Sequence, residues 1–319
     1  MPDSPREVSR LGVDTETTGV AFFDVPVIVT TAESDVDGVH TEFYTLPEDA
    51  EEVRARLASA DELVFHNAKF DLQKLALVGL LNADDLDPHR VFDTECFAHL
   101  LDENRRKGLK FLARELLGEE TDEEEVIRKE RRRLKLTKAD GYDKLPREVV
   151  EPYARKDAEF TIRLHDLLRP QIEGSENLRR LHALEQRLTF TLLRMETRGM
   201  GVEVEYVEAT AKRYASEALA VELAIRDELG IEEFNPNSPK QLMEAFAARG
   251  ISLESTDKAT LAGMDDELGQ QILELRTLKK MHGTYLKAIL DEQRDGILHP
   301  SYRQHGTRTG RMSSGAYDG

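Results

Sequence analysis

Two carboxylates spaced two residues apart mark the part of the chain best suited to chemistry. Asp14 and Glu16 stand in the stretch LGVDTETTG, between an apolar run and a turn rich in threonine and glycine. Residues two apart in a β-strand point to the same side, so both carboxylates are predicted to face one way at a strand end. Two like charges about 4 Å apart repel by about 4 kcal/mol at an effective dielectric constant of about 20. Such a pair is therefore either solvated or held by a cation.

Two further acids stand where a helix is expected. Asp157, in YARKD, shares a helical face with Tyr153 and Leu164. An unpaired charge on such a face is costly to bury, which predicts a cation, a salt bridge or a cleft beside it. Asp71, in HNAKFD, falls in the first turn of a predicted helix, where an acid can simply favour the helix dipole. Asn67, just before that helix, can simply be its N-cap.

Convergence of all four acids would require divalent cations to offset their mutual repulsion. Hard oxygen ligands favour Mg²⁺ or Mn²⁺ over softer metals. Two such ions close together are a known arrangement for in-line attack at phosphorus. The spacing of the acids in the sequence does not by itself establish that they converge.

The elements that must position these acids follow from the hydrophobic pattern. Residues 27–33, 40–46 and 62–66 are predicted strands, rich in β-branched and aromatic residues. An early run of strands followed by helices favours an α/β layer fold. Predicted helices cover residues 47–60, 68–80, 92–103, 109–118 and 146–168, with Pro152 as a possible interruption in the last.

A domain boundary is predicted within residues 169–177, where Pro, Gly and polar residues cluster. The expected domains are therefore residues 1–172 and 173–319. Beyond the boundary the pattern is nearly all helical, with a helix starting after an N-cap at Ser238 and another interrupted near Gly283. The final stretch, HPSYRQHGTRTGRMSSGAYDG, has no helical pattern.

Composition narrows the classes of protein. The 319 residues carry a formal net charge of −18 and a single cysteine, Cys96, which excludes an intrachain disulfide. No apolar run reaches the length of a membrane span, and the start lacks a signal-peptide core. These features predict a protein of the reducing cytoplasm without a membrane partner. The acidic run 119–125 and the basic run 128–135 are expected to be solvated helices, or alternatively a basic rim that guides a polyanion.

Three motifs together resemble a known family. DTETTG, HNAKFD and YARKD are similar, in order and spacing, to the exonuclease motifs of the DEDD superfamily, the ribonuclease-H-like 3′→5′ exonucleases. The tyrosine four residues before the last aspartate is the mark of the DEDDy branch. NPNSPKQL, LRTLKKMHGTYLKAI and TRTGRMSS resemble the thumb and first polymerase motif of family A DNA polymerases, the DNA polymerase I group. The resemblance covers residues 8 to 314. The architecture that it implies is similar to that of bacteriophage replicative polymerases.

This resemblance implies an α/β, ribonuclease-H-like exonuclease domain, a mixed sheet with helices, followed by a mostly α-helical thumb-like domain. It implies a 3′→5′ exonuclease that proofreads for a DNA polymerase and acts on single-stranded DNA 3′ ends and primer-template DNA. Asp14, Glu16, Asp71 and Asp157 match the acids that hold two divalent cations, Mg²⁺ or Mn²⁺. Glu16 and Tyr153 match the groups that orient the attacking water. Candidate DNA contacts are Asn67, Lys69, Phe70, Arg308 and Arg311. Arg155 and Lys156, inside the third motif, are further candidates to flank the DNA.

The chain departs from the family after GRMSS, where GAYDG replaces the expected continuation and the palm and fingers motifs are absent. We therefore expect no primer extension from this chain alone. The chain is either a fragment or one piece of a split polymerase completed by a second polypeptide. Two alternatives stay open: a ribonuclease-D-like RNA exonuclease with the same three motifs, and a non-catalytic DNA-binding subunit. For a bacteriophage protein, the expected location is the cytoplasm of the host cell.

Overall fold

The computed structural model describes residues 9–137 and 139–315. These residues form two compact units. The first unit runs to Arg198 and also contains residues 300–315, and the second is Gly199–His299. A mixed sheet with helices in the first unit and a mostly helical second unit confirm the predicted fold class.

The first unit is built on a five-stranded sheet with the order β3-β2-β1-β4-β5. β1 lies at its centre, antiparallel to β2 and parallel to β4. β3 pairs antiparallel with β2, and β5 pairs parallel with β4, so the sheet is mixed. The strands are β1 (Arg10–Thr17), β2 (Pro26–Asp35), β3 (Gly38–Thr45), β4 (Glu62–Phe65) and β5 (Val91–Asp93).

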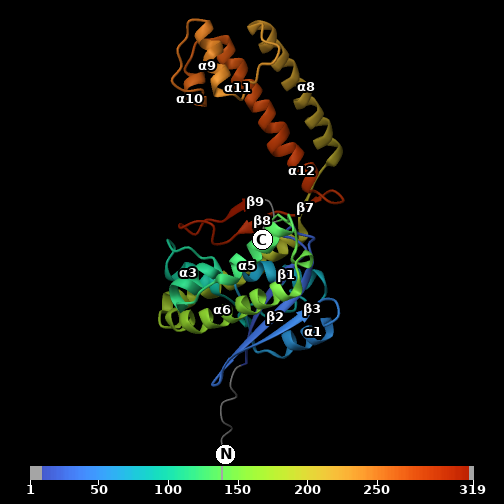
Figure 1. Cartoon of the computed structure of the whole chain (residues 1–319), viewed down its shortest axis with the longest axis vertical. Helices are drawn as coiled ribbons and strands as arrows, with labels where there is room; N and C mark the ends of the chain where they lie inside the picture. The colour runs from blue at the N-terminus through green and yellow to red at the C-terminus, as the bar shows by residue number, and fades with distance from the viewer. Residues whose placement is uncertain (1–8, 138, 316–319) are drawn as a thin grey trace, which may run out of the picture. The chain divides into compact units, whose positions relative to one another are not determined.

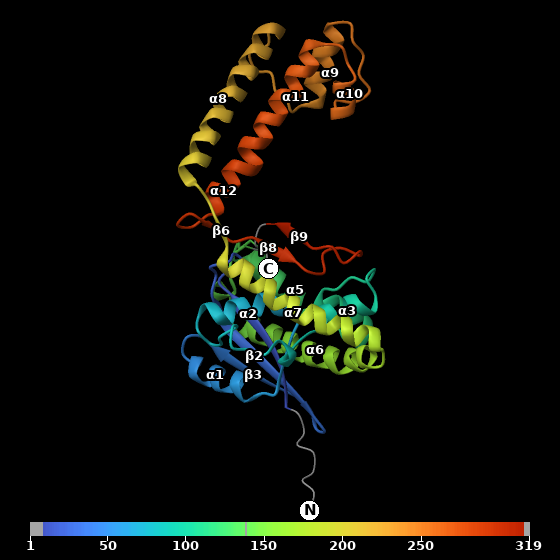
Figure 2. The same cartoon turned by 180° about the vertical axis from the view of Figure 1, so that it is seen from behind.

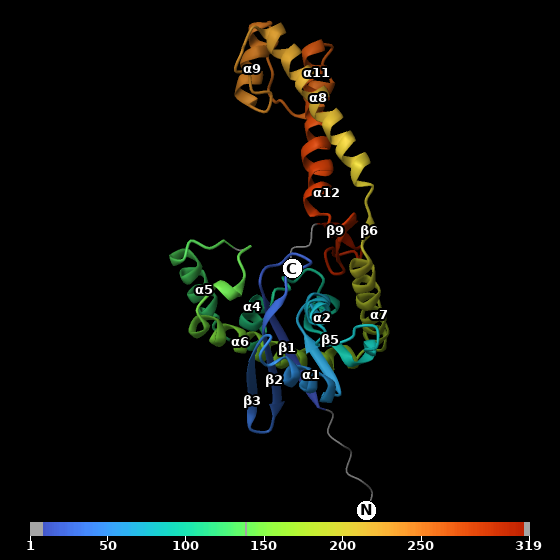
Figure 3. The same ribbon diagram turned by 90° about the vertical axis from the view of Figure 1, so that its right-hand side faces the viewer.

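Helices cover both faces of this sheet (Figures 1 and 2). On one face, α1 (Ala50–Ser59), α2 (Ala68–Leu77) and α7 (Glu176–Arg198) enclose a core that includes Leu11 and Val13 of β1. On the other face, α3 (Thr94–Leu101), α4 (Leu109–Leu112) and α6 (Arg147–Glu173) enclose a second core. Figure 3 views the sheet edge-on, with α4 and α6 on one side and α1, α2 and α7 on the other.

Short elements complete the first unit. α5 (Asp122–Arg133) packs on α6 and buries only Ile127 of its residues. β8 (Ser301–Arg303) and β9 (Ser313–Gly315) form an antiparallel pair in the final stretch, for which the sequence predicts no helix. The remaining elements are the 3₁₀ turns η1 (Pro88–Arg90) and η3 (Tyr142–Lys144) and the π-helical turn η2 (Ala113–Leu117).

The structure adds to what the pattern predicts for α6 and α7. α6 runs through Pro152 without a break, and it packs along β1 and β2. The compact units divide after Arg198, and the domain boundary between residues 172 and 173 stays a prediction. The units divide there because α7 packs Phe190 and Leu193 into the same core as β1.

The second unit is a helical pair with small helices at one end. α8 (Val204–Leu229) and α11 (Glu267–Lys280) pack side by side, as Figures 1 and 2 show. Ser238 caps α9 (Pro239–Ala248) by accepting from the Gln241 N–H, as predicted. Near Gly283 the helix widens into the π-helical turn η4 (Met281–Leu286) instead of breaking. The other elements are α10 (Lys258–Ala262), α12 (Lys287–Glu292), and the paired strands β6 (Met200–Gly201) and β7 (Ile297–Leu298).

No helix among residues 9–137 and 139–315 is long and apolar enough to cross a membrane.

Candidate active site

The close approach of α6 to β1 brings the first and third motifs together. Gly12 lies two residues before Asp14 on the same side of the strand, and a Cβ there would lie 3.1 Å from the Ala158 carbonyl oxygen. The absence of a side chain at Gly12 therefore lets α6 cross β1 closely. Thr30 of β2, paired with Asp14, donates its hydroxyl to the Ala154 carbonyl at 3.1 Å. These contacts place Asp157 beside Asp14.

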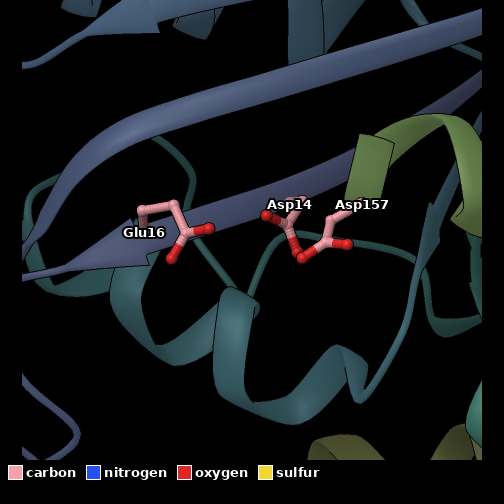
Figure 4. Close-up of side chains that lie close together, drawn as sticks. All are labelled: Asp14, Glu16 and Asp157. Carbon is pink, nitrogen blue, oxygen red and sulfur yellow. The ribbon is translucent and has the colours of Figure 1, made fainter. Parts of the chain in front are cut away.

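Three carboxylates meet at this crossing. Oxygen atoms of Asp14, Glu16 and Asp157 all lie within 4.8 Å of one another. Figure 4 shows Asp14 and Glu16 rising from the same strand and Asp157 reaching them from the helix. Glu16 and Asp157 are 5% and 6% exposed, so water screens their charges poorly. The pKa values of Asp14 and Glu16 are raised well above their ordinary values, first by burial and then by the neighbouring carboxylates.

Asp71 reaches β1 from the opposite helical layer. Its Oδ1 accepts from the Thr15 N–H at 3.1 Å and from the Thr15 hydroxyl at 2.7 Å. It is not one of the three acids whose oxygens lie within 4.8 Å, yet its charge raises the pKa of Asp14. Burial raises the pKa of Asp71 itself to about 7, and the Thr15 bonds oppose that shift. Thr15 thus fixes Asp71 close to the pair on β1.

Lys110 is the cation of this site, and the sequence did not predict it. Its Nζ forms ion pairs with Asp157 and, at 2.9 Å, with Glu123. The ammonium also lies 4.3 Å from the centre of the Tyr153 ring. Asp157 therefore forms a salt bridge with Lys110. A salt bridge is one of the environments predicted for a charge on an apolar helical face. Burial raises the pKa of Asp157 to about 6, although Lys110 lowers it.

Tyr153 is one turn before Asp157 on α6, and its side chain lowers the pKa of the Asp157 carboxyl. The ring of Tyr142, in η3, stacks on Tyr153 with centroids 5.8 Å apart. Before Tyr142, the chain passes close to the end of β1 at Gly141, where a Cβ would lie 2.4 Å from backbone atoms of Thr18. Tyr142 is a second residue that the motifs did not indicate, since its place depends on a loop closing over the end of β1.

The first turn of α2 carries the three predicted DNA contacts of the second motif. Asn67 has φ +70° and its side chain does not cap α2, contrary to the simplest expectation for it. The cap is the carboxylate of Asp93, which accepts from the N–H groups of Asn67 and Ala68 at 3.0 and 2.9 Å. Lys69 is paired with a buried glutamate, Glu196. Phe70 lies beside Lys69, and its ring centre is 5.2 Å from the Lys74 ammonium.

The other basic candidates lie in different surroundings. Arg308 donates to the Asn104 side chain at 3.2 Å, and Arg311 is exposed. Arg155 is tied to Glu151 and to the Thr41 carbonyl, and Lys156 to Glu159. The structure gives none of these four a contact with the three clustered carboxylates, and their DNA-binding roles stay predictions.

The donor set fits a hard divalent cation. All three clustered groups are carboxylates, and the one lysine beside them is shared with Glu123. An excess of buried negative charge remains and is reflected in the raised pKa values. A cation at the carboxylates would offset this charge, as oxygen-ligated Mg²⁺ or Mn²⁺ does elsewhere. Asp14, Glu16 and Asp157 are the residues that would bind it, with Asp71 close by.

Comparison with known proteins gives two family matches that divide the chain. Residues 3–173 match the model described as 3′–5′ exonuclease, and residues 204–316 match the model described as DNA polymerase family A. The acid cluster falls entirely in the first match. The second match covers most of the helical unit and the final stretch.

Individual relatives agree with these matches. The DNA polymerase of Escherichia phage T5 is 30% identical over 96% of this chain, and DNA polymerase I of Chloroflexus aurantiacus is 32% identical over 78%. The chain spans 40% of the length of the first relative and 27% of the second. A solved structure titled as the POL domain of Pol1 from M. smegmatis, in complex with DNA primer-template and dNTP, matches 96% of this chain and 51% of that chain. Its TM-score is 0.71 at 22% identity, which supports the fold.

Proposed function

We propose that this chain, which belongs to the family described as 3′–5′ exonuclease and is similar over residues 204–316 to DNA polymerase family A, removes nucleotides from DNA 3′ ends with the help of two divalent cations. The observation that carries the proposal is the meeting of Asp14, Glu16 and Asp157, with oxygens within 4.8 Å, inside the part that matches the exonuclease model. A single strand labelled at its 5′ end tests the direction: stepwise shortening of the labelled strand supports the proposal, and immediate release of labelled mononucleotide contradicts it.

The side chains have distinct proposed roles. Asp14, Glu16, Asp157 and Asp71 hold the cations, and Thr15 keeps Asp71 in place through its two hydrogen bonds. Bound divalent cations supply charge stabilisation at the phosphate and a more acidic attacking water. Glu16 and the Tyr153 hydroxyl orient that water. Lys110 fixes the Asp157 carboxylate through its ion pair and limits the repulsion among the acids.

The biological role that we propose is proofreading for a DNA polymerase, with primer-template DNA as the partner. The match of residues 204–316 to the polymerase model, which covers most of the helical unit, supports this role over RNA trimming. We do not expect these 319 residues alone to extend a primer. Polymerisation needs its own carboxylates to hold two metal ions, and the one group of three close acids in the described part of the chain belongs to the exonuclease unit.

The raised pKa values predict that cation binding depends on pH. The pKa values of Asp157 and Asp71 are about 6 and about 7, mainly because both carboxyls are buried. Cations bind the deprotonated forms, so the affinity for Mn²⁺ should rise about tenfold or more between pH 5.5 and pH 8, with release of protons. Calorimetry in buffers of different ionisation enthalpy measures both quantities. Equal affinity at the two pH values would contradict these assignments.

The same shifts predict the pH dependence of stability without metal. The folded protein keeps protons on these carboxyls that the unfolded chain releases, between about pH 4 and pH 7. Because the unfolded state then binds fewer protons, this contribution to stability falls as pH rises through that window. Saturating Mn²⁺ should restore the stability at pH 8, which thermal unfolding with and without EDTA records in the same experiment.

A further inference from the structure

A cavity of about 340 Å³ opens between two parts of the first unit that are far apart in the sequence. One wall is the first turn of α2, with Asn67, Lys69 and Phe70. The other wall is residues 301–306, here called the return segment, which lie in the stretch matching the polymerase model. The cavity therefore borders both the second exonuclease motif and a piece of the polymerase match.

A single buried carboxylate ties these two walls together. Glu196, near the end of α7, is 0% exposed. Its Oε1 accepts from the Lys69 Nζ at 2.5 Å and from the Tyr302 N–H at 2.5 Å. Lys69 belongs to the second motif, and Tyr302 belongs to the return segment. Charge-assisted hydrogen bonds of this kind are among the strongest in proteins.

The tie to Lys69 lies within one helical turn of a proposed metal-binding acid. Lys69 stands between Asn67, whose N–H is held by Asp93, and Asp71, whose carboxylate is held by Thr15. Together with Glu196, these contacts fix the first turn of α2 from three directions. A displacement of about 1 Å in an active site can lower a rate about 10²-fold.

We propose that Glu196 is a positioning residue for the exonuclease. Through Lys69 it holds the first turn of α2, and hence Asp71, in a fixed position relative to the return segment. The proposal rests on the exonuclease function proposed above. It adds a link between that reaction and the stretch that matches the polymerase model. Lys69 of the second motif and Tyr302 of the return segment thereby share one acceptor, the Glu196 carboxylate.

The return segment also has anchors that do not touch α2, and they provide a matched control. The Gln304 amide donates to the Glu185 carbonyl at 2.9 Å and accepts from the Thr189 hydroxyl at 3.0 Å. Replacing Gln304 with alanine should therefore loosen the return segment and leave Lys69 paired. Replacing Glu196 with glutamine removes the charge that holds Lys69.

The experiment compares Glu196→Gln and Gln304→Ala in the full chain with Mg²⁺ and single-stranded DNA. We expect Glu196→Gln to lower kcat about tenfold or more, and Gln304→Ala to leave it within about twofold of the parent. In hydrogen exchange, Glu196→Gln should accelerate exchange in residues 66–72, whereas Gln304→Ala should accelerate only residues 301–306. An unchanged kcat in Glu196→Gln, or slowed turnover without faster exchange in residues 66–72, would overturn the proposal.

A second pair of variants keeps the test valid if Glu196→Gln does not fold, since breaking a buried ion pair is destabilising. Lys69→Met removes the tie from the α2 side and leaves the Tyr302 bond to Glu196 in place. It should accelerate exchange in residues 66–72 alone, and Lys69→Arg should restore the parent pattern. Exchange at residues 66–72 that is the same in all three proteins would contradict the tie. Because exchange needs no substrate, this arm stands even if the exonuclease proposal fails.

Discussion

Replacing Asp14 and Glu16 together with alanine should lower the rate of 3′-end removal at least ~10³-fold, equivalent to about 4 kcal/mol of barrier. Both side chains come from β1, and with Asp157 they make up the one group of three close acids among the described residues. Losing two of the three leaves Asp157 as the one remaining acid of this group. Single-turnover assays on single-stranded DNA, with the enzyme in excess, measure this loss directly.

The double variant should nevertheless fold. The raised pKa values of Asp14 and Glu16 show that their charged forms are disfavoured in the folded protein, first by burial. Removing them should therefore not lower the melting temperature in EDTA at pH 8. A matched control replaces Glu51 and Glu52, two exposed acids on α1, and should keep the parent rate. A double variant that cleaves at the parent rate would place the active site elsewhere.

Asp157→Ala should lower the rate about 10²–10³-fold and Tyr153→Phe only about tenfold. The carboxylate would hold a cation that the mechanism requires, whereas the hydroxyl only orients the water and the Asp157 carboxylate. Tyr153→Phe keeps the ring that stacks on Tyr142 and lies under the Lys110 ammonium. Its loss is therefore confined to the hydroxyl.

The order of the two effects is what this comparison tests. Rates at saturating Mg²⁺ on the same single strand give both numbers. Tyr206→Phe, on an exposed tyrosine of α8, is the control for the loss of a phenolic hydroxyl and should not change the rate. A larger effect for Tyr153→Phe than for Asp157→Ala would mean that the two roles are assigned wrongly.

Local patterns predicted the acids and the elements that carry them. Asp14 and Glu16 lie on one side of β1 because alternation in a strand is a property of the backbone. Asp157 was singled out as a charge on an apolar helical face, and the structure buries it there. Strands, most helices and the Ser238 cap follow from the same short-range rules, which act within a few residues.

Contacts between distant residues could not be predicted in this way. Lys110 stands among apolar residues of a predicted helix, and this indicates that its charge needs a partner. Nothing near it in the sequence indicates that the partner is Asp157. Asp93 takes the capping role expected of Asn67 because β5 ends beside the start of α2. The division after Arg198 likewise depends on Phe190 packing against β1, which only the folded chain shows.

The most direct test of the central claim is digestion of 5′-labelled single-stranded DNA by the purified chain in Mg²⁺, in EDTA, and in EDTA followed by excess Mg²⁺. An RNA strand of the same sequence is assayed in parallel. We expect stepwise loss of nucleotides from the DNA 3′ end in Mg²⁺, none in EDTA, recovery when Mg²⁺ is restored, and slower loss from RNA. Digestion that continues unchanged in EDTA, or that releases the 5′ label first, would contradict a metal-dependent 3′→5′ exonuclease.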